Sequence, residues 1–123
     1  MKEKISLAPC NGMSPNGLVC RVAVGDIKKE NENMISICMG STSADIDNEN
    51  TEMLKKYPII ALNGCKNNCV NTILENKGVD VAKTINAGDV LDNCDVSAKD
   101  AFRLDSEGEE CVKIIKKELE KLF

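Results

Sequence analysis

The sequence predicts an α/β fold, a three-layer sandwich in which a largely parallel sheet of about four strands has helices on both faces. Three observations support this prediction. Apolar segments of strand length alternate with segments of helical periodicity. The apolar segments are short and nearly continuous, as in strands covered on both faces. The 123 residues contain no internal repeat or linker, so we expect residues 1–123 to form a single α/β domain.

The first part of the chain predicts two strands around one helix. Ile5–Pro9 is the first strand. Ser14 is a suitable N-cap, and the proline after it is tolerated at the first helical position, so a helix should run from there to about Lys29. Met34–Met39 is predicted as the second strand, and Gly40–Asn50 as a polar loop.

The middle of the chain repeats this alternation. Thr51–Tyr57 should form one or two helical turns, which a proline then ends. Ile59–Leu62 is predicted as the third strand. A helix over Cys65–Asn76 should end at a Lys-Gly pair, and Val79–Ile85 is predicted as the fourth strand.

The last third predicts helices. Asp89–Asn93 is expected to form a helical turn. Ser106–Glu109 resembles a capping box and should begin a final helix. Apolar residues then follow at helical spacing, so this helix should pack on the sheet; they are Val112, Ile115, Leu119 and Leu122.

Composition excludes several classes of function. The net charge is −4, the lysines are dispersed, and aromatic residues make up 2% of the chain, so we expect no nucleic-acid binding. We expect no membrane partner, because no apolar run reaches spanning length and no signal peptide is evident. A cytoplasmic location is expected, where thiols stay reduced. The oligomeric state is left open.

The cysteines carry the functional prediction. The chain has seven cysteines and no histidine, so a site for a soft metal must consist of thiolates. Cys10, Cys38 and Cys65 stand at or near the ends of predicted strands, and Cys69 follows four residues after Cys65. Because parallel strands end at one edge of a sheet, all four should converge there as ligands of zinc. Cys65 and Cys69 should share one helical face.

The other three cysteines are not predicted ligands, and two nearby cations are expected to balance charge at the site. Cys20 and Cys111 should be small core residues. Cys94 has acidic neighbours and is either a spare thiol near the site or unrelated to it. Four thiolates around a divalent ion leave a net negative charge, which Arg21 and Lys66 are candidates to offset. We also expect Gly12, Gly17 and Gly64, in a crowded loop region, to leave room for the backbone to approach a ligand.

The order of the cysteine motifs resembles the DGC-domain family, small prokaryotic proteins named for an Asp-Gly-Cys tripeptide after an apolar strand. The matching segments are Pro9–Gly12 with Gly17 and Arg21, Ile37-Cys38, Ala61–Cys69 and Val79–Val81. Asn63 stands where the family has aspartate. An asparagine could replace a carboxylate that holds a backbone turn, but not one that acts as a base. The resemblance implies zinc binding and no assigned reaction.

Several functions remain open. The leading hypothesis is a zinc-binding protein in which the metal is structural or in transit, and we expect a binding rather than a catalytic role, since four sulfur ligands leave no position for water. An iron–sulfur or metallocluster carrier, of the kind used in nitrogenase-cofactor assembly, is the first alternative. A second alternative is a thiol-based sulfur carrier or redox enzyme that uses Cys65 as nucleophile and Cys10 or Cys69 as the resolving thiol. A third is an interaction module that binds a protein partner.

Overall fold

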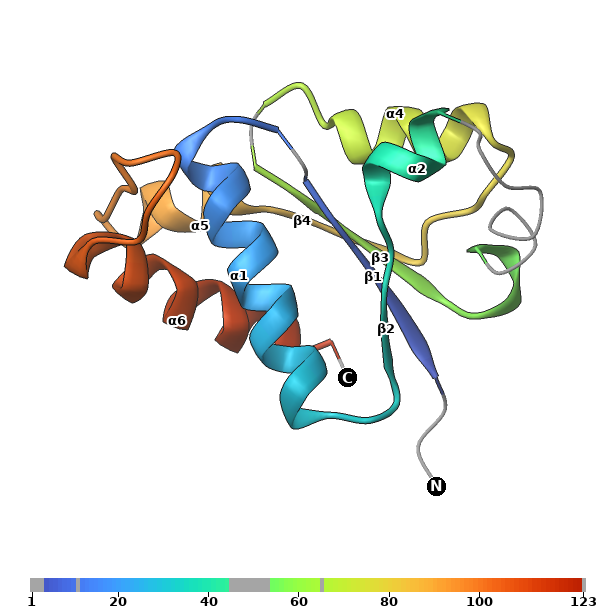
Figure 1. Cartoon of the computed structure of the whole chain (residues 1–123), viewed down its shortest axis with the longest axis horizontal. Helices are drawn as coiled ribbons and strands as arrows, with labels where there is room; N and C mark the ends of the chain where they lie inside the picture. Colours follow the sequence, from blue (N-terminus) through green and yellow to red (C-terminus); the bar gives the residue numbers. More distant parts are fainter. Residues whose placement is uncertain (1–3, 11, 45–53, 65, 123) are drawn as a thin grey trace.

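A four-stranded parallel sheet forms the centre of the molecule. The computed structural model describes residues 4–10, 12–44, 54–64 and 66–122. The strands are β1 (Ile5–Pro9), β2 (Met34–Ser36), β3 (Ile59–Asn63) and β4 (Lys83–Asn86), in the order β2-β1-β3-β4. Every neighbouring pair is parallel, which confirms the predicted α/β class (Figure 1).

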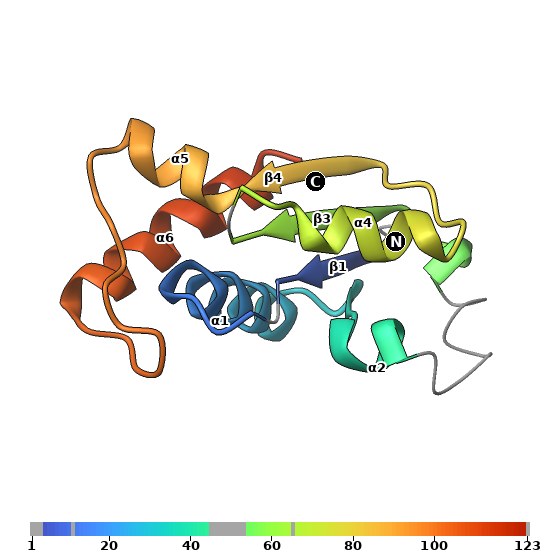
Figure 2. The ribbon, with the colours of Figure 1, turned by 90° about the horizontal axis from the view of Figure 1, so that it is seen from above.

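Helices cover both faces of this sheet. Figures 1 and 2 show α1 (Pro15–Glu30) and α6 (Ser106–Glu120) on one face, and α2 (Met39–Ala44) and α4 (Cys69–Asn76) on the other. Helix α5 (Ala87–Asn93) lies at the carboxyl end of β4 and contacts α6. The predicted three-layer arrangement is therefore confirmed.

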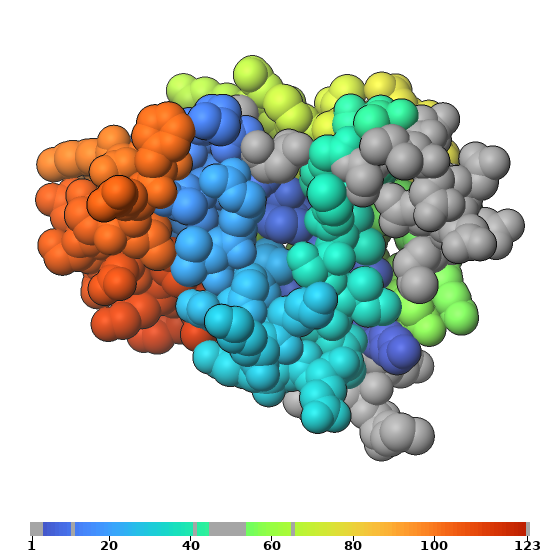
Figure 3. Space-filling model, viewed as in Figure 1, coloured from blue at the N-terminus to red at the C-terminus, as the bar shows by residue number. Residues whose placement is uncertain are grey.

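The core fills the two spaces between the sheet and its helices. All five residues of β3 are buried, as expected for a strand inside a sheet that is covered on both faces. Helix α1 buries one side, including Val19 and Ile27, both fully inaccessible. Figure 3 shows α1 next to α6 and the 94–105 segment, with which it forms a continuous surface. This packing fixes the first turn of α1 relative to the sheet edge.

Side-chain caps fix where the two long helices begin. The Ser14 hydroxyl accepts the Gly17 N–H at 3.0 Å, which confirms the predicted cap of α1. For α6 the predicted capping box was wrong by one residue, because Asp105 is the N-cap. Its carboxylate accepts the Gly108 N–H at 2.8 Å. Ser106 is instead the first residue of the helix.

The second strand is shorter than predicted, and a helix replaces part of the predicted loop. Strand β2 ends at Ser36, and α2 occupies Met39–Ala44. The change occurs at Cys38, whose carbonyl oxygen accepts both the Thr42 N–H at 3.1 Å and the Thr42 hydroxyl at 2.8 Å. Thr42 therefore favours a helical turn there. The remainder of the predicted loop, residues 45–50, lies outside the described residues.

The fourth strand also starts later than predicted, at Lys83 rather than Val79. Helix α4 ends with Gly78 in the left-handed region, at a φ of 71°. The N–H groups of Gly78 and Val79 bond back to the carbonyls of Glu75 and Leu74, each at 3.0 Å. The Val79 N–H is therefore used at the helix end and cannot pair within the sheet.

Two further helical predictions hold in part. Helix α5 begins at Ala87, two residues before the predicted turn, because the Asn86 side chain caps it by accepting the Asp89 N–H at 3.2 Å. In the predicted turn over Thr51–Tyr57, residues 54–56 are helical, while 51–53 lie outside the described residues.

Substituting Gly64 by alanine is expected to lower the free energy of unfolding by about 1–3 kcal/mol, the usual cost of overpacking. A Cβ at this position would lie 2.9 Å from the backbone nitrogen of Gly17, and backbone yields less readily than a side chain. Gly25→Ala is the matched control, since a Cβ there meets nothing within 4 Å and a helix interior favours alanine over glycine. Urea unfolding of both variants measures the difference; equal stability would contradict the close packing at Gly64.

Candidate metal centre

The edge formed by the carboxyl ends of the strands is the natural place for a ligand. Strand order reverses between β1 and β3, because the chain moves from β1 to β2 on one side and then returns to β3 on the other. Helix α1, after β1, covers one face, whereas α4, after β3, covers the opposite face. The two connections therefore diverge, and such switch points bind ligands in open α/β sheets.

Cys10 stands directly after β1 and is held firmly. It is 7% exposed, and its N–H donates to the Leu62 carbonyl of β3 at 2.8 Å. The Gly12 N–H lies 3.3 Å from the Cys10 Sγ and donates a hydrogen bond to it. The Gly12 carbonyl in turn accepts from Arg21 Nη1 at 3.0 Å. A sulfur atom with a backbone donor on it is suited to bear the negative charge of a metal ligand.

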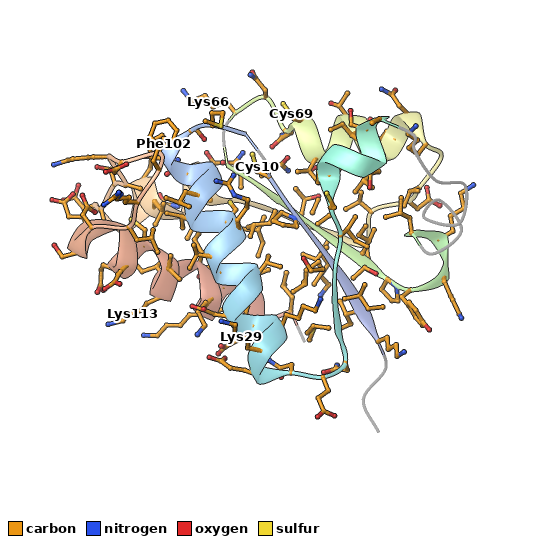
Figure 4. The ribbon with its side chains drawn as sticks, in the orientation of Figure 1. Cys10, Lys29, Lys66, Cys69, Phe102 and Lys113 are labelled. Carbon is orange, nitrogen blue, oxygen red and sulfur yellow. The ribbon has the colours of Figure 1, made fainter. Side chains whose placement is uncertain are left out.

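Cys69 approaches the same place from the other side of the switch point. It is the first residue of α4 and is exposed. Cys10 and Cys69 both line one pocket of about 230 Å³. The rest of its lining comes from the loop after β1 and from α4, namely Gly12, Met13, Ser14, Val70 and Ile73. Figure 4 shows both cysteines at the same end of the molecule.

The other two predicted ligands, Cys38 and Cys65, are not among the described residues that line this pocket. Cys38 is exposed in the connection between β2 and α2 and is not among the residues that line the pocket. Cys65 lies outside the described residues. Among the residues that the structure describes, no three cysteine or carboxylate side chains form a group that could hold a metal ion. The four-cysteine ligand set therefore remains a prediction.

The predicted helical relation between Cys65 and Cys69 was wrong. Helix α4 starts only at Cys69, residues 66–67 form a turn, and Asn68 is left-handed with φ 50° and ψ 47°. A left-handed residue cannot lie inside a right-handed helix. The Asn86 side chain holds this turn, because its Nδ2 donates to Asn68 Oδ1 at 3.0 Å. Cys65 and Cys69 therefore do not share one helical face.

Asn63 is a site residue whose position was noted from the sequence but whose role was not predicted. It is the last residue of β3 and is 1% exposed. Its Oδ1 accepts the Val70 N–H at 3.0 Å, and its Nδ2 donates to Asn71 Oδ1. Asn71 Nδ2 continues the chain to Thr84 Oγ1 of β4 at 2.9 Å. The side chain at position 63 therefore holds a backbone turn, which is one of the two roles considered above.

Glycines allow the loops to meet backbone to backbone. A Cβ on Gly17 would lie 2.5 Å from the Gly12 carbonyl oxygen, and one on Gly64 would lie within 3.2 Å of three backbone atoms at Asn16 and Gly17. The loop after β1, the first turn of α1 and the end of β3 are therefore in direct contact. Any larger residue would push the cysteine-bearing loops apart.

The remaining cysteines fit their simpler readings. Cys20 and Cys111 are inaccessible core residues, as predicted. Burial raises the pKa of the Cys111 thiol, and the negative charges of Glu107 and Asp105 raise it further. Cys94 is exposed at the C-cap of α5.

The two candidate cations differ in position. Arg21 binds the loop that follows Cys10, as its hydrogen bond to the Gly12 carbonyl shows. Lys66 is exposed and lines a different pocket, next to the cysteine pocket.

One known family matches most of this chain. The family model described as DGC domain matches residues 6–117, which covers most of the 123-residue chain. The chain belongs to the DGC-domain family. The DGC match begins in β1 and extends into α6, so it includes all four predicted ligand cysteines and Asn63. Neither the search of curated proteins nor that of solved structures gave a significant match. No described helix is long and apolar enough to cross a membrane.

Asn63→Ala is expected to lower the free energy of unfolding by about 1–3 kcal/mol, because it leaves the buried Val70 N–H without an acceptor. Asn63→Asp should lower the free energy of unfolding less, because one carboxylate oxygen can still accept the Val70 N–H. The other carboxylate oxygen can accept an N–H of Asn71 once that side-chain amide has turned over. Urea unfolding measures both. An aspartate variant as unstable as the alanine variant would argue against acceptor loss as the cause.

Proposed function

We propose that this DGC-domain protein binds a thiophilic metal ion, zinc in the first instance, with cysteine ligands at the carboxyl edge of its sheet. The supporting observation is that Cys10 and Cys69, far apart in the sequence, line one small pocket at the switch point. Cys65 belongs to the loop that joins β3 to Cys69, and Cys38 follows the strand adjacent to β1. These four residues are the proposed ligands, and the metal has a structural or trafficking role.

The donor chemistry suits this assignment. Thiolates prefer soft or borderline cations, and four of them around zinc leave no position for a reactive water. The Gly12 N–H on Cys10 and the Arg21 guanidinium on the Gly12 carbonyl both oppose the negative charge of such a complex. A structural or transfer role therefore fits better than hydrolysis. A cytoplasmic location, where the thiols remain available, is part of this proposal.

Cys10→Ser and Cys69→Ser are each expected to lower the zinc content of anaerobically purified protein to less than half of the original. Elemental analysis against protein concentration measures it. Cys94→Ser is the matched control, because Cys94 is also exposed but follows α5 and lies outside the cysteine pocket. Full zinc retention in both ligand variants would overturn the assignment of Cys10 and Cys69.

The same preparation separates the zinc proposal from an iron–sulfur cluster. A cluster carrier would be coloured, with iron and acid-labile sulfide present in place of zinc. A colourless protein with zinc bound supports the main proposal. Visible absorbance that disappears in Cys10→Ser would support the cluster instead.

A thiol-based activity is the second candidate, because two cysteines facing one pocket could act as nucleophile and resolving thiol. This candidate predicts that alkylation of chelator-treated protein, followed by mass spectrometry, labels Cys69 faster than the exposed Cys94, and Cys111 last. Cys111 is inaccessible and its pKa is raised, so little thiolate forms there at neutral pH. Labelling of Cys69 no faster than that of the exposed Cys94 would count against this candidate.

A further inference from the structure

A second pocket lies at the same edge of the sheet, beside the cysteine pocket. It has a volume of about 280 Å³, and its polar lining comes from three parts of the chain: the start of α1, the loop after β3, and the segment from the end of β4 through α5. The residues that matter for its chemistry are Asn16, Gly64, Lys66, Asn86, Asp89 and Asp92. We propose that this pocket binds a small zwitterion of the α-amino-acid class.

The pocket lies where the fold favours ligand binding. The first turn of α1 and the loop after β3 both line it, so it is at the switch point between β1 and β3. Ser14 lines this pocket and the cysteine pocket, so the two adjoin at the loop before α1. The cysteine pocket is bounded by α4, whereas α5 bounds this one. The loop after β1 therefore lines both pockets, and the two differ in the helix on the other side.

Its walls are held in place before any ligand arrives. Asn86 is fixed at both ends of its amide, since Nδ2 donates to Asn68 Oδ1 at 3.0 Å and Oδ1 accepts the Asp89 N–H at 3.2 Å. Gly64 is packed against the backbone of α1. A Cβ on Gly88 would lie 3.2 Å from Asn86 Oδ1, so a side chain there would press on this fixed wall. A preformed polar wall of this kind reduces the ordering cost of binding.

The charges of the lining select the ligand. Lys66 supplies a cation, and Asp89 and Asp92 supply two carboxylates from one side of α5. In the part of the chain that the structure describes, none of these three side chains forms an ion pair. A ligand with only a negative charge would be repelled by the two carboxylates, and a ligand with only a positive charge would be repelled by the lysine. A ligand with both charges satisfies both sides.

Size narrows the class further. Drug-sized ligands occupy pockets of roughly 300–1,000 Å³, and this pocket is slightly smaller. A dinucleotide therefore does not fit, whereas a free amino acid does. The amide of Asn16 can donate or accept, so it suits either the carboxylate or the ammonium group. This inference does not rest on the metal proposal, since among the residues that the structure describes no cysteine lines the pocket.

The test is a titration of the full chain by calorimetry or by NMR chemical shifts. L-alanine is the probe, and propionate and ethylamine each carry only one of its two charges. We expect saturable binding of L-alanine and at least tenfold weaker binding of the other two. Lys66→Met and the double variant Asp89→Asn with Asp92→Asn should each weaken L-alanine binding about tenfold. Lys29→Met is the control, because Lys29 is exposed at the far end of α1 (Figure 4).

The outcomes separate this inference from the metal site. In a Cys10→Ser, Cys69→Ser double variant, L-alanine should bind as in the unchanged protein even where zinc is lost. If propionate binds as tightly as L-alanine, the pocket is an anion site and the proposal is overturned. Absence of saturable L-alanine binding, or equal weakening by Lys29→Met, would also overturn it.

Discussion

The parallel pairing of β1 with β3 is the constraint on which the candidate site depends. Pro9 pairs with Leu62, and the Cys10 N–H extends this pairing by donating to the Leu62 carbonyl. The two strands are separated by 49 residues of the 123-residue chain, yet their carboxyl ends are fixed side by side. Because the helices that follow them cover opposite faces, the loops part and leave space for a ligand. Both pockets at this edge result from that divergence.

Backbone contact then sets how closely these loops approach. Gly17 and Gly64 allow main chain to lie against main chain where side chains would separate it. Arg21 and Asn63 complete the arrangement from outside the loops, since one binds the Gly12 carbonyl and the other the Val70 N–H. The cysteines are therefore presented by a framework that contains no cysteine itself. This separation explains how one edge can carry a sulfur-lined pocket and a polar one.

The sequence was sufficient to predict the elements whose signals are local. β1, α1 and β3 follow from short apolar runs and from a Ser-Pro helix start, and the structure has them almost as predicted. The errors occurred where distant side chains decide the backbone. Asn63 and Asn86 hold the chain around the first residue of α4, so the helix starts at Cys69 rather than Cys65. Val79 bonds back to α4 and so leaves the strand that its apolar pattern predicted.

For the site, topology was the informative part of the prediction. Parallel strands were expected to bring strand-end cysteines to one edge, and Cys10 and Cys69 do line a common pocket there. The polar pocket could not be predicted, because its polar lining comes from three parts of the chain whose proximity depends on packing at Gly64 and Gly88. The role of Asn63 was equally hidden, since its partners lie seven and eight residues further along the chain.

The hydrogen bonds that position α4 have one more consequence. Asn63, Asn71 and Thr84 are linked through amides and a hydroxyl, none of which gains or loses a proton in the range where proteins are normally studied. The scaffold under Cys69 is therefore indifferent to acidity, whereas thiolate ligands are not. Acid would then release a bound metal by protonating sulfur without breaking the amide and hydroxyl hydrogen bonds that hold α4 in place.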